Sequence, residues 1–168
     1  MTVSHPGRSG DAGPRSADRG IVRGMTCFAI VTGGGTAGHV LPALAVADAL
    51  VAAGHDPSEV HYVGCERGIE TRLVPPTGYP CTFLDVIGLQ RRLDPSNLWF
   101  GPKLWRARRA AIALVRQLDP RVVVSVGGYA SLPAVLAARR LDVPIVVVSY
   151  DQRPGRASRL AARRAAAC

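Results

Sequence analysis

Short apolar runs alternate with segments of helical periodicity from Thr26 to the end of the chain. The runs are bounded by glycine or proline and are rich in valine and isoleucine, as is typical of strands buried on both faces of a parallel sheet. We predict strands at 27–32, 59–63, 81–87, 121–126 and 144–149, and helices at 40–53, 69–74, 97–118, 132–141 and from 158 onward. This alternation predicts an α/β fold with a doubly wound, Rossmann-like parallel sheet.

The first part of the chain lacks this pattern. Residues 1–24 are rich in glycine, serine, arginine, aspartate and proline and show no periodicity. We expect them to form a disordered tail, and we expect residues 25–168 to form one domain. Met25 stands directly before the first apolar run and is a candidate translation start.

A glycine-rich segment, Thr32–His39, connects the first predicted strand to the first predicted helix. Gly33, Gly35 and Gly38 satisfy the spacing GxGxxG. Glycines let the main chain approach a ligand closely, and the N-terminus of the following helix offers unpaired N–H groups with a partial positive charge. We therefore predict a phosphate or diphosphate ligand here, with Pro42 in the first helical turn, where its missing N–H does no harm.

The glycine spacing alone leaves the ligand open. A dinucleotide site also needs an acidic residue after the second strand, to bind the ribose, and Glu66 is the nearby candidate. His39, at the helix start, favours chemistry instead, as a proton acceptor or as a hydrogen-bond donor. The alternatives are a solvated capping histidine and an NAD(P)-dependent oxidoreductase.

A second glycine segment follows the fourth predicted strand, at Gly127–Pro133, with Ser131 as the expected helix cap. A third candidate loop spans Tyr150–Gly155. In an open parallel sheet such loops meet at the carboxyl edge, where ligands bind. The alternative is that these loops are ordinary tight turns between strands and helices.

Charge and composition limit the classes of binding partner and the cellular compartment that the sequence favours. The net charge of +9 favours anionic partners, which include nucleic acid, acidic lipid and phosphorylated substrates. The four scattered cysteines favour neither a zinc site nor a disulfide framework, and so indicate a reducing cytosol. No apolar run has the length of a membrane span, and the first residues lack the apolar core of a signal peptide. We expect any membrane contact to be peripheral.

Both tryptophans lie in a short stretch that is also rich in arginine. Trp99, Phe100 and Trp105 are interspersed with basic residues that include Arg106. Aromatic side chains with a basic rim suit the surface of an anionic membrane leaflet. The alternative is a core helix whose aromatic side chains face the sheet.

Four segments together resemble the MurG family of glycosyltransferases. GGGTAGHVLPALAVADAL is similar to that family's GGTGGHxxPAL signature, and VVVSVGGYASLPAVLAARRLDVPIVVV is similar to its GGYxSxPxxxAA block. Gly64–Pro80, which includes Glu70, is similar to the family's second loop and helix, and Gly88–Arg92 is similar to its basic GLR segment. The resemblance extends from Thr26 to the end of the chain.

The resemblance implies the N-terminal half of a two-domain GT-B enzyme that makes peptidoglycan. This half would bind an undecaprenyl-pyrophosphoryl sugar acceptor, and a C-terminal domain, which we do not find in the chain, would bind UDP-N-acetylglucosamine. The implied reaction is an inverting transfer of N-acetylglucosamine to the acceptor's 4-hydroxyl, on the cytoplasmic face of the plasma membrane, without cofactor or nucleic acid. The absence of a DxD motif predicts no required metal. A non-catalytic binding subunit or a truncated product is the alternative.

The resemblance also carries over to individual residues. By motif, Gly34, Gly35, Thr36 and Gly38 line the acceptor diphosphate, His39 lies by the reacting hydroxyl, and Gly128, Tyr129 and Ser131 complete the site. Where the family reads HEQN, this chain has Tyr150–Arg153, so Asp151 replaces the family's glutamate and is the second candidate for a catalytic residue. Ala37 stands at a position where the family commonly has glycine.

Overall fold

A single parallel sheet organises the part of the chain that the computed structural model describes, which is residues 27–86, 100–149, 156–163 and 165–167. The strands are β1 (Ala29–Gly33), β2 (Val60–Cys65), β3 (Cys81–Leu84), β4 (Val122–Gly127) and β5 (Ile145–Val147). They lie in the order β3-β2-β1-β4-β5, and every neighbouring pair is parallel. The predicted doubly wound α/β sheet is confirmed.

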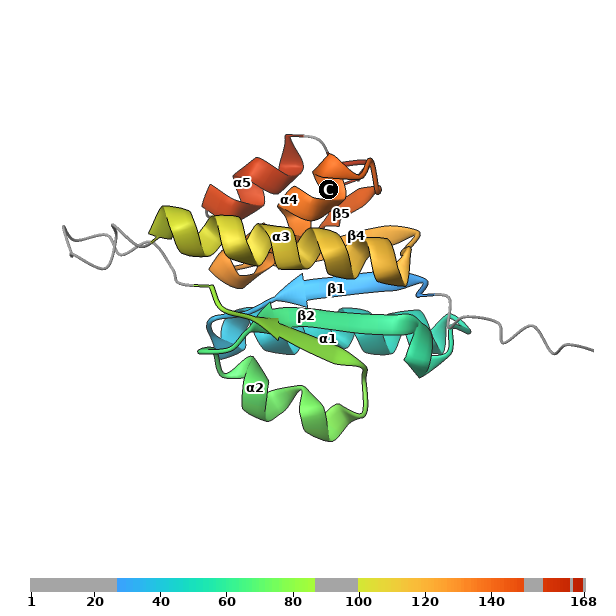
Figure 1. Ribbon diagram of the computed structural model, residues 1–168. Coiled ribbons are helices and arrows are strands. Elements are labelled where there is room, and N and C mark those ends of the chain that lie inside the picture. The colour runs from blue at the N-terminus through green and yellow to red at the C-terminus, as the bar shows by residue number, and fades with distance from the viewer. Residues whose placement is uncertain (1–26, 87–99, 150–155, 164, 168) are drawn as a thin grey trace, which may run out of the picture.

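Helices cover both faces of this sheet (Figure 1). The α-helices of the described ranges are α1 (Ala37–Ala52), α2 (Glu70–Leu73), α3 (Phe100–Leu118), α4 (Leu132–Arg140) and α5 (Arg156–Ala162). Short 3-10 helices in the described residues are η1 (Pro57–Glu59), η2 (Pro75–Thr77) and η4 (Tyr129–Ser131). The successive strand residues Ile30 and Val31 belong to two different apolar clusters, and both are fully buried. Because strand side chains alternate between faces, the sheet is buried on both sides.

The two apolar clusters assign the helices to their faces. Ile30 shares its cluster with Ala107 and Ala111 of α3 and with residues of α4. Val31 shares the other cluster with Val40 and Ala43 of α1. The strand order reverses at β1, which has β2 on one side and β4 on the other. The carboxyl ends of β1 and β4 therefore flank the point at which open α/β sheets bind ligands.

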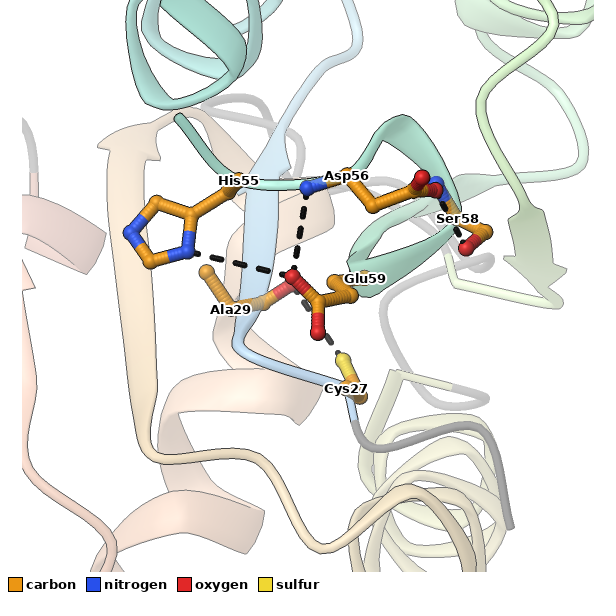
Figure 2. A network of polar contacts seen from close by, with 6 residues as sticks. All are labelled: Cys27, Ala29, His55, Asp56, Ser58 and Glu59. Carbon is orange, nitrogen blue, oxygen red and sulfur yellow. Dashed lines mark hydrogen bonds and ion pairs between the residues drawn. The ribbon is translucent and has the colours of Figure 1, made fainter. Parts of the chain in front are cut away.

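The opposite, amino edge of the sheet is tied together by local polar contacts (Figure 2). The Asp56 carboxylate accepts hydrogen bonds from the main chain and the side chain of Ser58, while Glu59 accepts one from the Asp56 amide. His55 lies 3.9 Å from the Glu59 carboxylate and stacks on Phe28. These contacts cap η1 and close the connection between α1 and β2, so this edge has a structural role.

Several element boundaries differ from the sequence predictions. Helix α1 begins at Ala37, so Pro42 lies in its second turn, and the prediction of a first-turn proline is wrong. The proline has no N–H to donate to the carbonyl group four residues earlier, that of Gly38. The third strand ends at Leu84, where the Val86 amide turns back to the Leu84 carbonyl oxygen at 2.8 Å. The predicted tail at residues 1–24 and the candidate loop at residues 150–155 lie outside the described residues. No helix in the described ranges combines the length and the apolar character that crossing a membrane requires.

Candidate functional site

The first glycine turn, Gly33–Thr36, connects the end of β1 to α1. Gly35 has φ +89°, a left-handed conformation that glycine adopts without the steric penalty of a side chain. Thr36 is extended and precedes the first helical residue, and its side chain does not cap the helix. The amides of Ala37 and Gly38 are the first two of α1, and they have no carbonyl group of a preceding helical turn to bind. They are available to an anion at the carboxyl edge of the sheet.

The second glycine turn, Gly127–Tyr129, follows β4 and lies directly against the first. A Cβ atom placed on Gly128 would be 2.2 Å from the carbonyl oxygen of Gly34. Gly128 also has φ +79°. The two turns therefore touch main chain to main chain, and only glycine permits that approach. We call this contact the turn junction.

Tyr129 closes one side of the turn junction. Its ring lies over Gly35, such that a Cβ atom on Gly35 would be 2.5 Å from the tyrosine Cε1. The Cys65 thiol, at the end of β2, donates a hydrogen bond to the Tyr129 hydroxyl oxygen at 3.5 Å. Burial raises the pKa of Tyr129, and burial also raises the pKa of the Cys65 thiol. Both groups are therefore neutral at physiological pH.

Glu70 lies beneath the first glycine turn and is fully buried. The Gly35 N–H donates to both of its carboxylate oxygens, at 3.2 Å to Oε1 and 3.1 Å to Oε2. The Cys65 N–H donates to Oε1 at 2.9 Å. The sequence alone indicates no function for Glu70 beyond its place in the segment that resembles the MurG family. The two glycines that precede it, Gly64 and Gly68, are the signal, because the Glu70 side chain occupies the space that their Cβ atoms would fill.

His39 faces the second glycine turn from the first turn of α1. Its Nδ1 is 3.0 Å from the Thr36 hydroxyl oxygen. A Cβ atom on Gly127 would lie 3.2 Å from the imidazole Cδ2, 3.5 Å from Nε2 and 3.0 Å from the Ser158 hydroxyl oxygen. Thr36 of the first glycine turn and Gly127 at the end of β4 thus lie beside the imidazole ring, and Ser158 of α5 approaches the same Gly127 position. The structure therefore places His39 beside the second glycine turn, next to the turn junction.

Ser131 has a different local role from the predicted one. Its hydroxyl donates back to the carbonyl oxygen of Gly128 at 2.9 Å, and its side chain makes no capping bond with α4. Ser131 thus occupies the predicted N-cap position of α4, but the capping hydrogen bond expected of its side chain is not formed. The side chain is fully buried and stabilises the second glycine turn from within. Asp151 lies outside the described residues.

The predicted membrane-contact residues are described in part. Trp105 is 55% exposed on α3, and the Arg109 guanidinium lies 4.9 Å from the centre of its ring. Arg106 is also exposed. The alternative in which this tryptophan faces the sheet is wrong, because Ala107 and Ala111 form the buried face of the helix. Trp99 and the side chain of Phe100 lie outside the described residues.

The dinucleotide interpretation finds no support at the end of β2. Glu66, the candidate for binding a ribose, is exposed and lines an open depression with Arg67, Gly68, Ile69, Thr71 and Arg72. The carboxylate that does reach the first glycine turn is Glu70, and it is buried and bound to main-chain amides. A ribose hydroxyl cannot reach it, whereas dinucleotide folds use such a carboxylate for that contact.

Comparisons with known proteins agree with this geometry. The model of the glycosyltransferase family 28 N-terminal domain matches residues 29–168. A relative from Mycobacterium leprae is 39% identical over 170 residues, which cover 98% of this chain and 41% of the relative. A relative from Streptomyces avermitilis is 42% identical over 138 residues, which cover 82% of this chain and 38% of the relative. Both are named UDP-N-acetylglucosamine--N-acetylmuramyl-(pentapeptide) pyrophosphoryl-undecaprenol N-acetylglucosamine transferase.

Solved structures give the same picture. The crystal structure of Acinetobacter baumannii MurG superposes with a TM-score of 0.72 at 30% identity and covers 84% of this chain and 40% of that one. The Streptomyces glycosyltransferase SsfS6 shares the fold, with a TM-score of 0.56 at 24% identity, over 80% of this chain and 42% of its own. This chain thus spans about two fifths of the length of the relatives it matches. The resemblance to the MurG family is confirmed, and the chain belongs to glycosyltransferase family 28, whose N-terminal domain it contains.

Proposed function

We propose that this chain binds the lipid-linked acceptor of an N-acetylglucosaminyltransferase. The acceptor would be N-acetylmuramyl-(pentapeptide) pyrophosphoryl-undecaprenol and the donor UDP-N-acetylglucosamine, as the names of the relatives state for those proteins. The observation that carries the proposal is the turn junction, because it places a helix N-terminus, two close main-chain turns and a histidine at one point of the sheet edge.

The acceptor diphosphate is the group that this arrangement suits. The amides of Ala37 and Gly38 start a helix of 16 residues, and the partial positive charge at such an end stabilises an anion. Neither residue presents a bulky side chain, so a phosphate can approach the main chain closely. Thr36 and Gly38 are exposed at the same end of the helix, as a ligand contact requires. The second glycine turn would bound the site opposite the helix.

His39 would act as the general base in this reaction. The transfer needs the acceptor hydroxyl to lose its proton as its oxygen attacks the anomeric carbon, while UDP leaves from that carbon. When Nδ1–H donates to the Thr36 hydroxyl oxygen at 3.0 Å, Nε2 is the nitrogen that accepts a proton. Nε2 also lies toward the second glycine turn. Asp151 remains the second candidate for this role.

Membrane association belongs to the same proposal, since the acceptor is a lipid. Trp105 and the adjacent Arg106 and Arg109 form an exposed aromatic and basic patch near the start of α3. Helix α3 follows β3 and leads into β4, so it starts at the carboxyl edge of the sheet, where the turn junction lies. We propose that this patch contacts the anionic inner face of the plasma membrane and brings the site to its substrate.

The catalytic part of the proposal is tested by His39→Ala in a two-domain transferase, made by joining this chain to the C-terminal part of the Mycobacterium leprae relative. We expect kcat to fall by roughly 10²- to 10⁴-fold, the usual contribution of a general base. His55→Ala is the matched control, because His55 lies at the amino edge of the sheet. Unchanged turnover in His39→Ala would remove His39 from the chemistry. An unmodified fusion that binds no lipid-linked acceptor would overturn the proposed function.

A further inference from the structure

Glu70 is a buried carboxylate that accepts hydrogen bonds from the main-chain N–H groups of Gly35 and Cys65. It is fully buried, and within the described ranges no lysine, arginine or histidine forms a salt bridge with it. An ionised carboxylate is costly to bury unless hydrogen bonds compensate its lost hydration. Here the N–H groups of Gly35 and Cys65 supply that compensation. These hydrogen bonds therefore hold the main chain at Gly35 and Cys65 against the carboxyl group.

Three glycines make room for this carboxylate. A Cβ atom would lie 2.2 Å from Oε1 if placed on Gly34, 2.7 Å from Cγ if placed on Gly64 and 1.9 Å from Oε2 if placed on Gly68. These glycines come from the first glycine turn, from β2 and from the loop before α2. A side chain at any of these three positions would collide with Glu70. The buried carboxylate therefore requires glycine at all three positions.

The two amides that Glu70 binds lie at the two places that shape the proposed acceptor site. Gly35 carries the left-handed bend of the first glycine turn, which directs the chain into α1. Cys65 donates from its thiol to Tyr129, and the Tyr129 ring covers Gly35. The Glu70 carboxylate thus connects the left-handed bend at Gly35 to the end of β2 at Cys65. Through the Cys65 thiol it is also connected to the Tyr129 ring.

We infer that Glu70 is a positioning residue of this site. It fixes the first glycine turn from below, so that the amides of Ala37 and Gly38, and the imidazole of His39, face the acceptor in the arrangement that the reaction needs. Because the Gly35 amide binds Glu70, the acceptor diphosphate is left to the first amides of α1. This inference rests on the proposed function, since it concerns the same site.

The test compares Glu70→Gln with Glu66→Gln in the 168-residue chain. Glutamine keeps the size of the side chain but directs an N–H₂ group at main-chain N–H donors, so one hydrogen bond is lost and two donors oppose each other. Glu66 is exposed and lies in the same loop, which makes its substitution the matched control. The readouts are the amide signals of Gly35 and Cys65 by NMR, and the affinity for a short-chain lipid-linked acceptor by calorimetry.

We expect Glu70→Gln to shift and broaden both amide signals and to weaken acceptor binding by about ten-fold or more, with Glu66→Gln matching the unmodified chain. If Glu70→Gln is folded and binds with unchanged affinity, Glu70 only stabilises the fold and the inference is wrong. If Glu70→Gln does not fold, Gly68→Ala, whose methyl group displaces the carboxylate without removing it, provides the same comparison. If even the unmodified chain binds no acceptor, the proposed function fails, and the amide signals still report whether Glu70 holds the turn.

Discussion

The contact between Gly128 and Gly34 decides how closely the two glycine turns approach. Gly128 meets the carbonyl oxygen of Gly34, and main-chain atoms cannot move aside as the end of a flexible side chain can. Its φ of +79° adds a second requirement for glycine. The residue therefore has two separable costs of substitution, one conformational and one steric.

Gly128→Ala is expected to lower the free energy of unfolding by clearly more than Gly54→Ala. Gly54 has φ +104° with open space around its Cβ position, so its substitution reports mainly the conformational cost of about 1–2 kcal/mol. Urea denaturation of both variants measures the difference, which is the cost of separating the two turns. Equal values for the two variants would mean that the turns do not touch in solution.

His61 gives a residue-scale prediction about pH. Burial lowers the pKa of His61, whose Nε2 lies 2.9 Å from the Thr82 hydroxyl oxygen on β3. The unfolded chain binds a proton near pH 6.5 and the folded chain binds it only at lower pH, so this residue makes stability fall as the pH drops below about 6.5. In His61→Gln the loss of Tm between pH 7 and pH 5 is expected to be smaller than in the unmodified chain. An identical loss of Tm in both proteins would show that His61 does not contribute to the pH dependence of stability.

At the residue scale, local sequence patterns identify the glycines of the two turns and the position of His39 at a helix start, but they do not identify the contact of Glu70 with the first turn. The spacing Gly33, Gly35 and Gly38 shows on its own that a strand turns closely into a helix. The partner of the Gly35 amide lies 35 residues later, and no local pattern reveals a contact of that range. Ser131 shows the same limit, since a hydroxyl before a helix can cap it or bond backwards, and tertiary packing selects the second.

At the scale of elements, α3 has one face that packs against the core and another that is exposed to solvent. Ala107, Ala111 and Val115 recur at helical spacing and are buried, whereas Trp105 and Arg109 are exposed. The small side chains let α3 and α4 pack closely, since α4 contributes Ala134, Ala137 and Ala138 to the same apolar cluster. The periodicity of the sequence predicted the helix, and the alanines determine which side packs inward.

Ala111→Leu is expected to destabilise the fold by about 1–3 kcal/mol, because extra methyl groups do not fit a close-packed helix interface. Ala110→Leu is the matched control, since Ala110 is its exposed neighbour on the same helix. Thermal unfolding of both variants measures the effect. Similar Tm values for the two would show that α3 does not pack on α4 through this face.

The element order was predictable for a physical reason. Valine- and isoleucine-rich runs flanked by glycine and proline have few alternatives to buried parallel strands, and all five predicted strands are present. The start of a helix was harder to predict. Helix α1 begins with Ala37 and Gly38, and these small residues do not contribute to a pattern of apolar positions at helical spacing. The first turn of that helix, which is the part the ligand would meet, was therefore predicted as loop.

At the scale of the whole molecule, the net charge of +9 comes mainly from arginines, and their positions determine which surface would attract an anionic membrane. Arg106 and Arg109 flank the exposed Trp105 near the start of α3, while Arg116 and Arg121 are exposed toward the amino edge of the sheet. If the patch near Trp105 contacts the membrane, equal losses of charge at the two places should have unequal effects.

The double variant Arg106→Gln/Arg109→Gln is expected to bind vesicles of anionic lipid roughly 30-fold more weakly than the unmodified chain, at about 1 kcal/mol for each arginine. Arg116→Gln/Arg121→Gln, with the same net charge, should bind more nearly as the unmodified chain does. Vesicle sedimentation at two salt concentrations measures both. Equal weakening in the two double variants would indicate a general attraction in place of a docking surface.

The most direct test of the central claim is an NMR titration of the ¹⁵N-labelled chain with a short-chain lipid-linked acceptor. The amide signals of Ala37, Gly38 and Gly128 are predicted to shift together along one binding curve, because the diphosphate would lie at the turn junction. If the largest shifts fall instead on Arg67 and Arg72, in the open depression beside α2, the acceptor binds elsewhere and the account is contradicted.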